Sequence, residues 1–467
     1  MPNLTAFGAT EYMDGALTLE VLKELFLRGT QLRPRGRRAR GRGLTAFDTH
    51  DTEEEDRERR QESRALEAID LTGCISVVFA NALTDFVTTH FLPHSAESDS
   101  GSEDEDHRES RRLNSLPVSQ DEPLQLPGVR RLGLRGVKSV LPHILTPFVL
   151  AFPSLTHLDL SGTRVTPELL LALGNSSTVR LHSLALARCT RLTSESIRDF
   201  LVDSPASSGI VELSLYGDTT FPSPLVEDDL RYILSLAPSF ASGEMVYLDL
   251  SSTPLTKHML SEVWKPQPKL RSLGLSHMPT LALKAVSDFV KDKAPNIEIL
   301  TLVGTSPELD CGLRAGTGGR RPSLLQGSVA LHNEIIRPLC TSLLSISHNA
   351  QSSWKPAPPV TRLRVVELAT PMLAGLGAGA GSWRIVRSKG GRGWYVDTAS
   401  GWVAECNQGQ GSDTCEGSVL RRDLEVGHPL RVQMEKWADA NGNVNSGVGW
   451  HARKMEVKLS LSLRRVR

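Results

Sequence analysis

The feature that most constrains this chain is a repeated phrase, L-x-x-L-x-L, in which other apolar residues sometimes replace leucine. From 129 to 155 to 181 the phrase recurs after 26 residues twice, and from 245 to 270 to 297 after 25 and then 27. A period of this length is typical of stacked repeats, in which each unit buries its apolar face against its neighbours. Copies begin at Leu22, Leu66, Val129, Leu155, Leu181, Ile210, Met245, Leu270, Ile297 and Leu363.

Each copy carries the signals of a strand followed by a helix. The alternation in L-x-L predicts a short strand with one buried face. The run Thr166-Pro167-Glu168 then predicts a helix start, with a capping hydroxyl, a proline at the first helical position and an acid near the positive end of the helix dipole. We therefore predict a right-handed α/β solenoid over residues 1–369, with a curved parallel sheet inside and helices outside.

One repeat has a recognisable subtype. The segment LALARCTRLTSESI (184–197) resembles the cysteine-containing leucine-rich repeat, the type found in F-box receptor domains and ribonuclease-inhibitor-like arrays. Leu71-Thr-Gly-Cys74 is a shorter match, and other repeats place threonine near the cysteine position: Thr163, Thr253 and Thr305. The resemblance implies a protein-binding array without catalytic activity, and more specifically a substrate receptor of a ubiquitin ligase.

That specific form requires an F-box, for which the chain offers no room, because only three residues precede the first repeat-like position, Leu4. We expect a Skp1-type adaptor as a partner only if the native N-terminus is longer. In either form the array should bind other proteins, and their identity does not follow from the repeat.

Composition excludes several other classes of protein. Lys+Arg and Asp+Glu number 53 each, so the whole-chain charge predicts no nucleic-acid partner. No apolar run approaches the ~18 residues that a membrane span needs, and no secretory signal precedes the repeats. The six cysteines contain no C-x-x-C, which argues against a zinc site or a disulfide framework. Reduced thiols in the cytoplasm or nucleus are the expectation.

Charged inserts interrupt the array. Residues 33–62 and 94–122 are rich in charge and poor in apolar side chains, so we predict that both are disordered. The basic run Arg33–Arg42 leaves open an association with nucleic acid, although a solvated loop is the favoured interpretation. Ser100 and Ser102 match the preference of acidophilic kinases, a pattern that is common in acidic loops. Residues 306–330 are predicted to form a further loop.

The C-terminal part differs from the repeats. A Gly/Ala-rich linker is predicted at 370–382, and residues 383–467 form a small mixed block that holds five of the seven tryptophans. This block, especially GWYVDTASGWV, resembles the tail of uncharacterised fungal leucine-rich-repeat proteins. We expect it to cap the open apolar end of the solenoid. A small-molecule site lined by tryptophans is the alternative, and the least favoured function for the chain.

No catalytic, cofactor-binding or metal-ligating residues are predicted. The glycines at 375 and 377 imitate a dinucleotide fingerprint, but a strand follows them where a helix is needed. The run that starts at Asp439 imitates a calcium loop, but it has Val444 where glycine is required and Trp450 where glutamate is needed.

The phrase also predicts which side chains lie inside. Alternate strand residues point to opposite faces, so the fourth position of each copy should enter the core and the third and fifth should lie on the concave face. The position after the last leucine should lie there too. The core should contain one stacked column of leucines: Leu158, Leu184, Leu213, Leu248 and Leu273.

Five residues at the concave positions are our candidates for contacts with a partner: His157, Asp159, Tyr216, Tyr247 and Asp249. Interface energy concentrates in a few aromatic or arginine anchors, so the two tyrosines are the candidate hot spots. The two aspartates favour a basic partner. The alternative is that L-D-L-S is simply a common way to build this strand.

Overall fold

The computed structural model describes residues 4–9, 11–27, 66–92, 124–309, 324–340, 361–377, 379–380, 383–387, 392–397, 401–404 and 419–422. The chain divides into two compact units. Unit 1 comprises Met1–Leu132 and Val137–Leu155, and unit 2 comprises Gly133–Gly136 and Thr156–Arg467. The inserts predicted at 33–62 and 94–122, with Arg33–Arg42, Ser100 and Ser102, lie outside the described residues.

Unit 1 follows the strand-and-helix pattern of the repeats around an aromatic core. Phe26, Phe86, Phe148 and Phe152 are buried and pack against one another, with ring centroids 5.3 Å apart for Phe26 and Phe86 and 5.2 Å apart for Phe148 and Phe152. The strands follow the order β1-β2-β3, and β1 pairs with β2 in parallel. Its elements are β1 (Ala6–Gly8), η1 (Asp14–Ala16), α1 (Leu19–Leu27), β2 (Ala68–Asp70), α3 (Val77–His90), β3 (Arg131–Gly133) and α4 (Pro142–Leu150).

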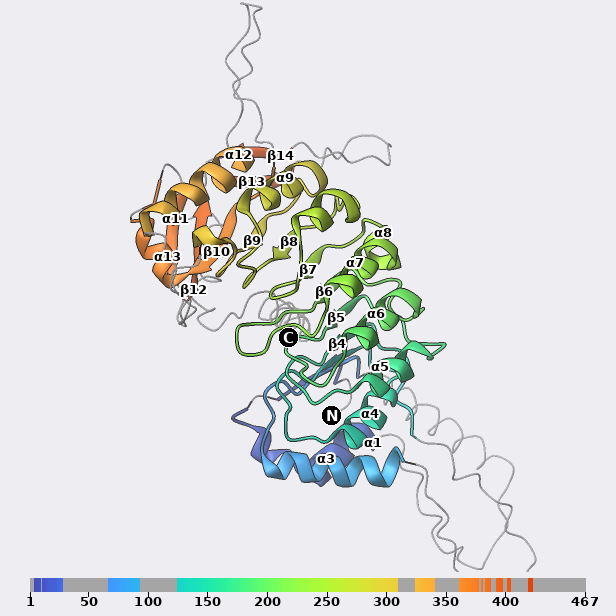
Figure 1. Ribbon diagram of the computed structural model, residues 1–467. Coiled ribbons are helices and arrows are strands. Elements are labelled where there is room, and N and C mark those ends of the chain that lie inside the picture. Colours follow the sequence, from blue (N-terminus) through green and yellow to red (C-terminus); the bar gives the residue numbers. More distant parts are fainter. Residues whose placement is uncertain are drawn as a thin grey trace, which may run out of the picture. The chain divides into compact units, whose positions relative to one another are not determined.

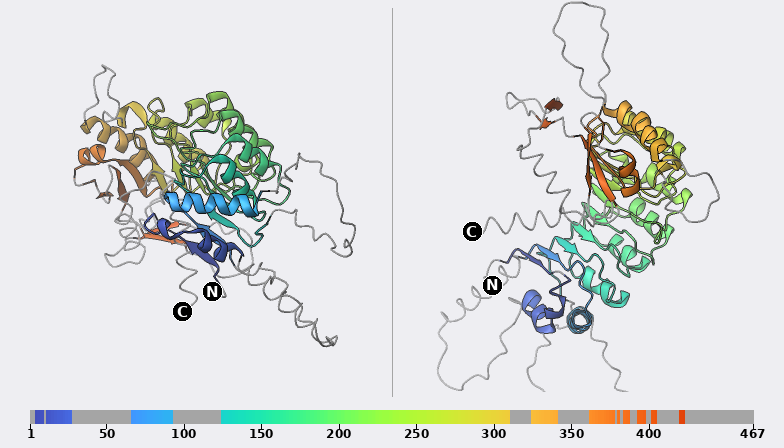
Figure 2. Two further views of the ribbon diagram at one scale, coloured as in Figure 1. Left: turned by 90° about the horizontal axis from the view of Figure 1, so that it is seen from below. Right: turned by 90° about the vertical axis from the view of Figure 1, so that its left-hand side faces the viewer.

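Unit 2 is a longer run of the same pattern, in which each strand pairs in parallel with the next and helices lie on the other side (Figure 1). The right-hand view of Figure 2 shows the same separation of strands from helices. This arrangement confirms the predicted α/β leucine-rich-repeat solenoid. The strands are β4 (His157–Asp159), β5 (Ser183–Ala185), β6 (Glu212–Ser214), β7 (Tyr247–Asp249), β8 (Ser272–Gly274), β9 (Ile299–Thr301) and β10 (Val365–Ala369).

Helices α5, α6 and α7 are one to a repeat. α5 begins at Pro167 with Thr166 at its N-cap, as predicted, but the Thr166 side chain forms no capping hydrogen bond. Thr193 caps α6 by accepting a hydrogen bond from the Ser196 N–H, and the Ser196 hydroxyl completes a capping box. The helical elements of unit 2 are α5 (Pro167–Gly174), α6 (Ser194–Asp203), α7 (Glu227–Leu236), α8 (Pro238–Ala241), η2 (Met259–Val263), α9 (Leu283–Lys293), α10 (Ser306–Leu309), α11 (Leu324–Leu331), η3 (His332–Ile336), α12 (Arg337–Cys340) and α13 (Thr370–Gly375).

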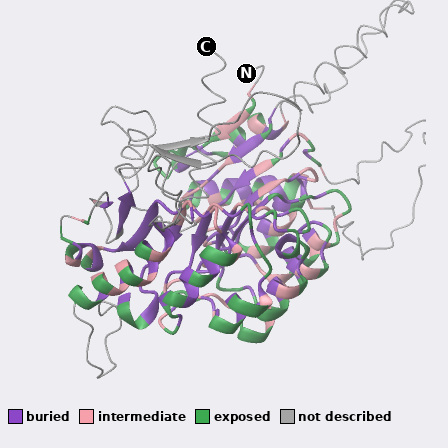
Figure 3. Cartoon of the chain, turned by 90° about the horizontal axis from the view of Figure 1, so that it is seen from above, coloured by how far each residue is buried: buried purple, intermediate pink, exposed green. Residues whose placement is uncertain are grey.

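The leucine column is confirmed in full. Strand register pairs Leu158 with Leu184, then Leu213, Leu248 and Leu273 in turn, and all five side chains are fully buried. In Figure 3 the strands are mostly purple, for buried, whereas the helices of the array carry most of the green, exposed surface. The period of the apolar phrase therefore defines both the register and the inside of the array.

A second regularity lies in the turn after each strand. The backbone there turns into the left-handed region at glycines in some repeats and at Arg188 (φ 56°), Ser252 (φ 64°) and His277 (φ 59°) in others. The N–H of each turn residue donates to a carbonyl of the next repeat, for example from Ser252 to Ser276 over 2.7 Å. This bond continues the strand ladder and holds the strained turn in place.

The parallel run ends in two antiparallel strands. β12 (Arg392–Asp397) pairs with β10, and β11 (Trp383–Arg387) pairs with β12. Trp383, Trp394 and Tyr395 are buried against this end of the sheet. Strands β13 (Gly401–Ala404) and β14 (Val419–Arg422) pair with each other as a separate sheet.

Two boundaries need correction. The predicted linker at 370–382 contains α13, whose residues Met372 and Leu373 are buried, because Thr370-Pro371 starts a helix before the glycines begin. The predicted loop at 306–330 begins in α10 and ends in α11. Apolar residues close to the glycines allowed these short helices, which the composition of the segments concealed.

Candidate interaction surface

The structure places the five predicted contact residues on the sheet positions expected from the phrase, but it does not leave them open. His157 is half-buried, whereas Asp159, Tyr216, Tyr247 and Asp249 are buried, with exposed fractions of 3%, 1%, 2% and 0%. Neither candidate tyrosine is therefore exposed in this structure. A role of the five residues in binding a partner stays a prediction.

The aspartates stabilise the turns that follow their strands. Oδ1 of Asp159 accepts a hydrogen bond from the Ser161 N–H over 2.9 Å, and Oδ1 of Asp249 accepts one from the Ser251 N–H over the same distance. Asp70 of unit 1 does the same with the Thr72 N–H. Each carboxylate thus closes the turn after its own strand, as aspartate commonly does. This geometry explains why D-L-S and D-L-T recur in the sequence.

The tyrosines fill the space that small neighbours leave. Tyr216 packs on Ala187, and the guanidinium carbon of Arg188 lies 5.4 Å from the centre of its ring. Tyr247 lies beside Asp249 on β7, and burial, aided by the nearby carboxylates of Asp249 and Glu367, raises the pKa of Tyr247 well above its ordinary value. Ala187 and Gly274 are small residues at concave positions, beside Tyr216 and Asp249 respectively. The chain's own tyrosines and aspartates occupy the room that these small residues leave.

The cysteine position of the repeat is also structural. The Cys189 thiol is buried and donates to the Leu160 carbonyl over 3.2 Å, and the Thr163 hydroxyl donates to the same oxygen over 2.7 Å. Thr253 makes the equivalent bond to Leu250 in its own repeat. Threonine can therefore replace cysteine here because both satisfy a buried carbonyl. Burial raises the pKa of Cys189 to about 12, which keeps the thiol protonated and unreactive.

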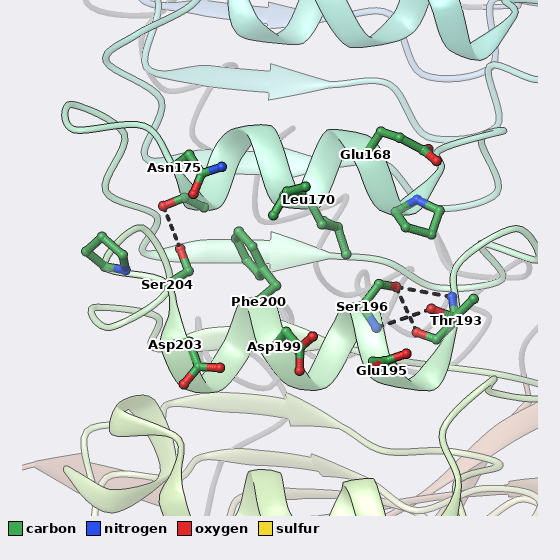
Figure 4. Close-up of a pocket in the computed structure, with 14 residues that line it drawn as sticks. Glu168, Leu170, Asn175, Thr193, Glu195, Ser196, Asp199, Phe200, Asp203 and Ser204 are labelled. Carbon is green, nitrogen blue, oxygen red and sulfur yellow. Dashed lines mark hydrogen bonds between the residues drawn. The ribbon is translucent and has the colours of Figure 1, made fainter.

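An open site lies instead on the helical side of unit 2. A groove of about 580 Å³ runs between α5 and α6 (Figure 4). Leu170 of α5 and Phe200 of α6 point toward each other between the helices and form its floor. At one end Thr193 and Ser196 hold the capping box, and at the other the Ser204 hydroxyl donates to the Gly174 carbonyl over 3.5 Å.

Two features of the groove suit recognition. Leu171 on its edge is 67% exposed, which is unusual for a leucine on a helix whose other leucines are buried. Gly174 allows Ser204 of the next repeat to approach closely at one end of the groove, since a Cβ added at position 174 would already lie 3.4 Å from the Ser204 side chain. The groove therefore offers apolar surface on two helices that are fixed by the packing of the array.

The groove is acidic. Its lining residues include Glu168, Glu195, Asp199 and Asp203, and none of them is lysine, arginine or histidine. Hydrogen bonds from the Thr166 side chain and the backbone lower the pKa of Glu168, so that carboxylate stays ionised. Arg198 of α6 reaches Asp199 over 2.7 Å and Glu195 over 3.5 Å.

Sequence reasoning did not single out this surface. A signal was present, because Glu195, Asp199 and Asp203 are spaced by four residues and therefore share one face of a helix. What the sequence could not show is that α5 lies alongside this face and leaves a groove.

The described residues include no group of three His, Cys, Asp or Glu side chains that could bind a metal ion together. Within those same ranges, no helix has the length and apolar character that crossing a membrane requires.

Compared with protein-family models and with curated protein sequences, the chain matches none. Solved structures include similar folds. The leucine-rich repeat-containing protein LegL7 from Legionella pneumophila has a TM-score of 0.31 and 14% identity, over 67% of this chain and 81% of LegL7. An internalin, InlF, from Listeria monocytogenes has a TM-score of 0.25 and 13% identity, over 52% of this chain and 63% of the internalin. Both TM-scores are too low to support a fold assignment, so the assignment rests on the repeats of this chain.

Proposed function

We propose that this chain is a protein-binding scaffold, and that it engages its partner through the groove between α5 and α6. The observation that carries the proposal is the groove itself: an apolar floor and an acidic rim on two helices that the neighbouring repeats hold in place. Binding surfaces of this composition, apolar in the middle and polar at the edge, are typical of protein interfaces.

The shape of a repeat array supports the same function. Each repeat contacts only its neighbours, so the helical side forms an extended surface on which single residues can differ without loss of the fold. We propose no catalytic role. The described thiols that a nucleophilic mechanism would need are buried, and burial raises the pKa of Cys74 and Cys189 to about 12.

A more specific form of the proposal is a substrate receptor of a ubiquitin ligase in the cytoplasm or nucleus. What supports it is the resemblance of residues 184–197 to the cysteine-containing repeats of F-box receptor domains. In this form a Skp1-type adaptor would bind only if the native N-terminus is longer, and the groove would hold the substrate.

The test is affinity capture with the full chain followed by mass spectrometry. A genuine partner should be recovered reproducibly, should be displaced by excess untagged chain and should bind the purified chain directly. Recovery of a Skp1-type adaptor would support the receptor form. Recovery that nuclease treatment abolishes would overturn the scaffold in favour of nucleic-acid binding through Arg33–Arg42. The absence of any protein that the untagged chain displaces would overturn it as well.

A further inference from the structure

We infer that the groove between α5 and α6 accepts a basic peptide segment, one that carries arginine or lysine at regular spacing and at least one apolar side chain. The inference rests on the proposed function and adds to it the chemistry of the partner. Three observations carry it: the apolar floor, the stripe of carboxylates, and the placement of Asp203 where it does not help the fold.

The floor determines what the middle of the partner must be. Leu170 and Phe200 close the groove from the two helices, and Leu171 extends the apolar surface to the solvent. Leu170 and Phe200 are only 1% and 4% exposed, so the apolar area that a leucine-like or aromatic partner side chain would cover is chiefly that of Leu171. Burying apolar area stabilises a complex by about 25 cal/mol per Å² before the losses of association are counted.

The carboxylates at the rim determine the charge that the partner must carry. Glu195, Asp199 and Asp203 project from successive turns of α6, and a helix rises about 6 Å over four residues. Arg198 compensates only part of this charge, because its guanidinium also binds Asp229 of α7 over 2.8 Å. Asp203 forms no ion pair among the described residues. A partner with cations about 6 Å apart could meet each carboxylate in turn.

Asp203 does not contribute to the helix in which it lies. Like charges four residues apart on a helix repel each other. Asp203 is the last residue of α6, where the negative end of the helix dipole disfavours an acid and favours a cation. Residues that destabilise their own helix or strand without stabilising another part of the structure are expected at functional positions. Docking of cations would remove both costs.

The experiment selects peptides from a random library of about 12 residues, displayed on phage, against the full chain. We expect the enriched peptides to carry a net positive charge, with arginine or lysine recurring and an apolar residue between them. A fluorescently labelled synthetic copy of the best peptide then serves as the probe in anisotropy titrations. Its affinity should fall when the salt concentration rises from about 50 to about 300 mM.

The decisive variant is Asp199→Asn with Asp203→Asn, which keeps size and removes charge. It should weaken binding of the probe peptide by about tenfold or more. The matched control is Asp292→Asn, since Asp292 is an exposed acid in the last turn of α9, outside the groove. It should leave binding within about twofold. Circular dichroism establishes that each variant folds, and Glu195→Gln provides an independent second variant on the same stripe.

Enriched peptides without net positive charge, or equal affinity for wild type and the double variant, would overturn the inference. So would a selection that enriches no peptide. The inference can fail while the scaffold proposal stands. If a captured protein partner binds the Asp199→Asn, Asp203→Asn variant as tightly as wild type, the scaffold stands and the partner binds elsewhere.

Discussion

Replacing Gly274 by alanine should destabilise unit 2 by about 3 kcal/mol, although glycine to alanine is one of the mildest changes in most contexts. Gly274 ends β8, directly beside Asp249 on β7. A Cβ at position 274 would lie 2.5 Å from both Cγ and Oδ1 of Asp249. Carbon atoms in proteins do not approach so closely, so the carboxylate would have to move.

The magnitude follows from what that movement breaks. The Asp249 carboxylate is fully buried and accepts the Ser251 N–H over 2.9 Å. A hydrogen bond to a charged group contributes about 1.5–3 kcal/mol, and crowding of a packed site costs about 1 kcal/mol or more. Gly209→Ala is the matched control, because a Cβ there would meet its nearest atom, the Leu181 carbonyl oxygen, at an ordinary 3.7 Å.

Urea unfolding followed by circular dichroism measures both variants, and a loss of 3 kcal/mol should lower the midpoint by about 1 M. A double-mutant cycle with Asp249→Ala identifies the cause. In that background the clash is absent, so Gly274→Ala should cost less than about 1 kcal/mol and the coupling should be about 2 kcal/mol. If Gly274→Ala costs as little as the control, or costs the same with and without Asp249, the structural reasoning is refuted.

Further experiments test three other parts of the fold. Leu248→Asp should bury an unpaired charge in the leucine column and cost about 4 kcal/mol or more, so an unchanged melting temperature would contradict the register. Ser252→Gly should stabilise unit 2 by about 0.5–1 kcal/mol by relieving the left-handed turn, whereas Gly162→Ala at an equivalent turn should destabilise it, and thermal unfolding compares the pair. At about pH 8 iodoacetamide should label Cys189 on the order of a thousandfold more slowly in the folded chain than in urea, as followed by mass spectrometry. Because burial raises the pKa of Cys189 from 9.0 to about 12, its contribution to stability should be complete below pH 9 and lost as the pH rises from 9 toward 12. Cys189→Thr should reduce that loss, and an identical alkaline profile would contradict the assignment.

The sequence by itself determined the repeat, the fold class and the leucine column. The reason is that strand residues alternate between two faces, so a one-residue shift in register would expose every leucine of the column. The same local logic located the start of α5, where an N-cap threonine, a proline at the first helical position and a first-turn acid follow one another in the sequence. Patterns of this kind depend only on residues that are close together in the sequence.

Only the tertiary structure decided which strand residues are accessible and where an open surface lies. Burial of Asp249 depends on Gly274, which belongs to the next repeat, and no pattern within one repeat encodes that contact. The groove likewise arises from residues of α5 and α6 that are about 30 positions apart, whose side chains meet only when two repeats stack. An acidic stripe can be read from α6 alone, but its conversion into a groove depends on the distance and packing between helices.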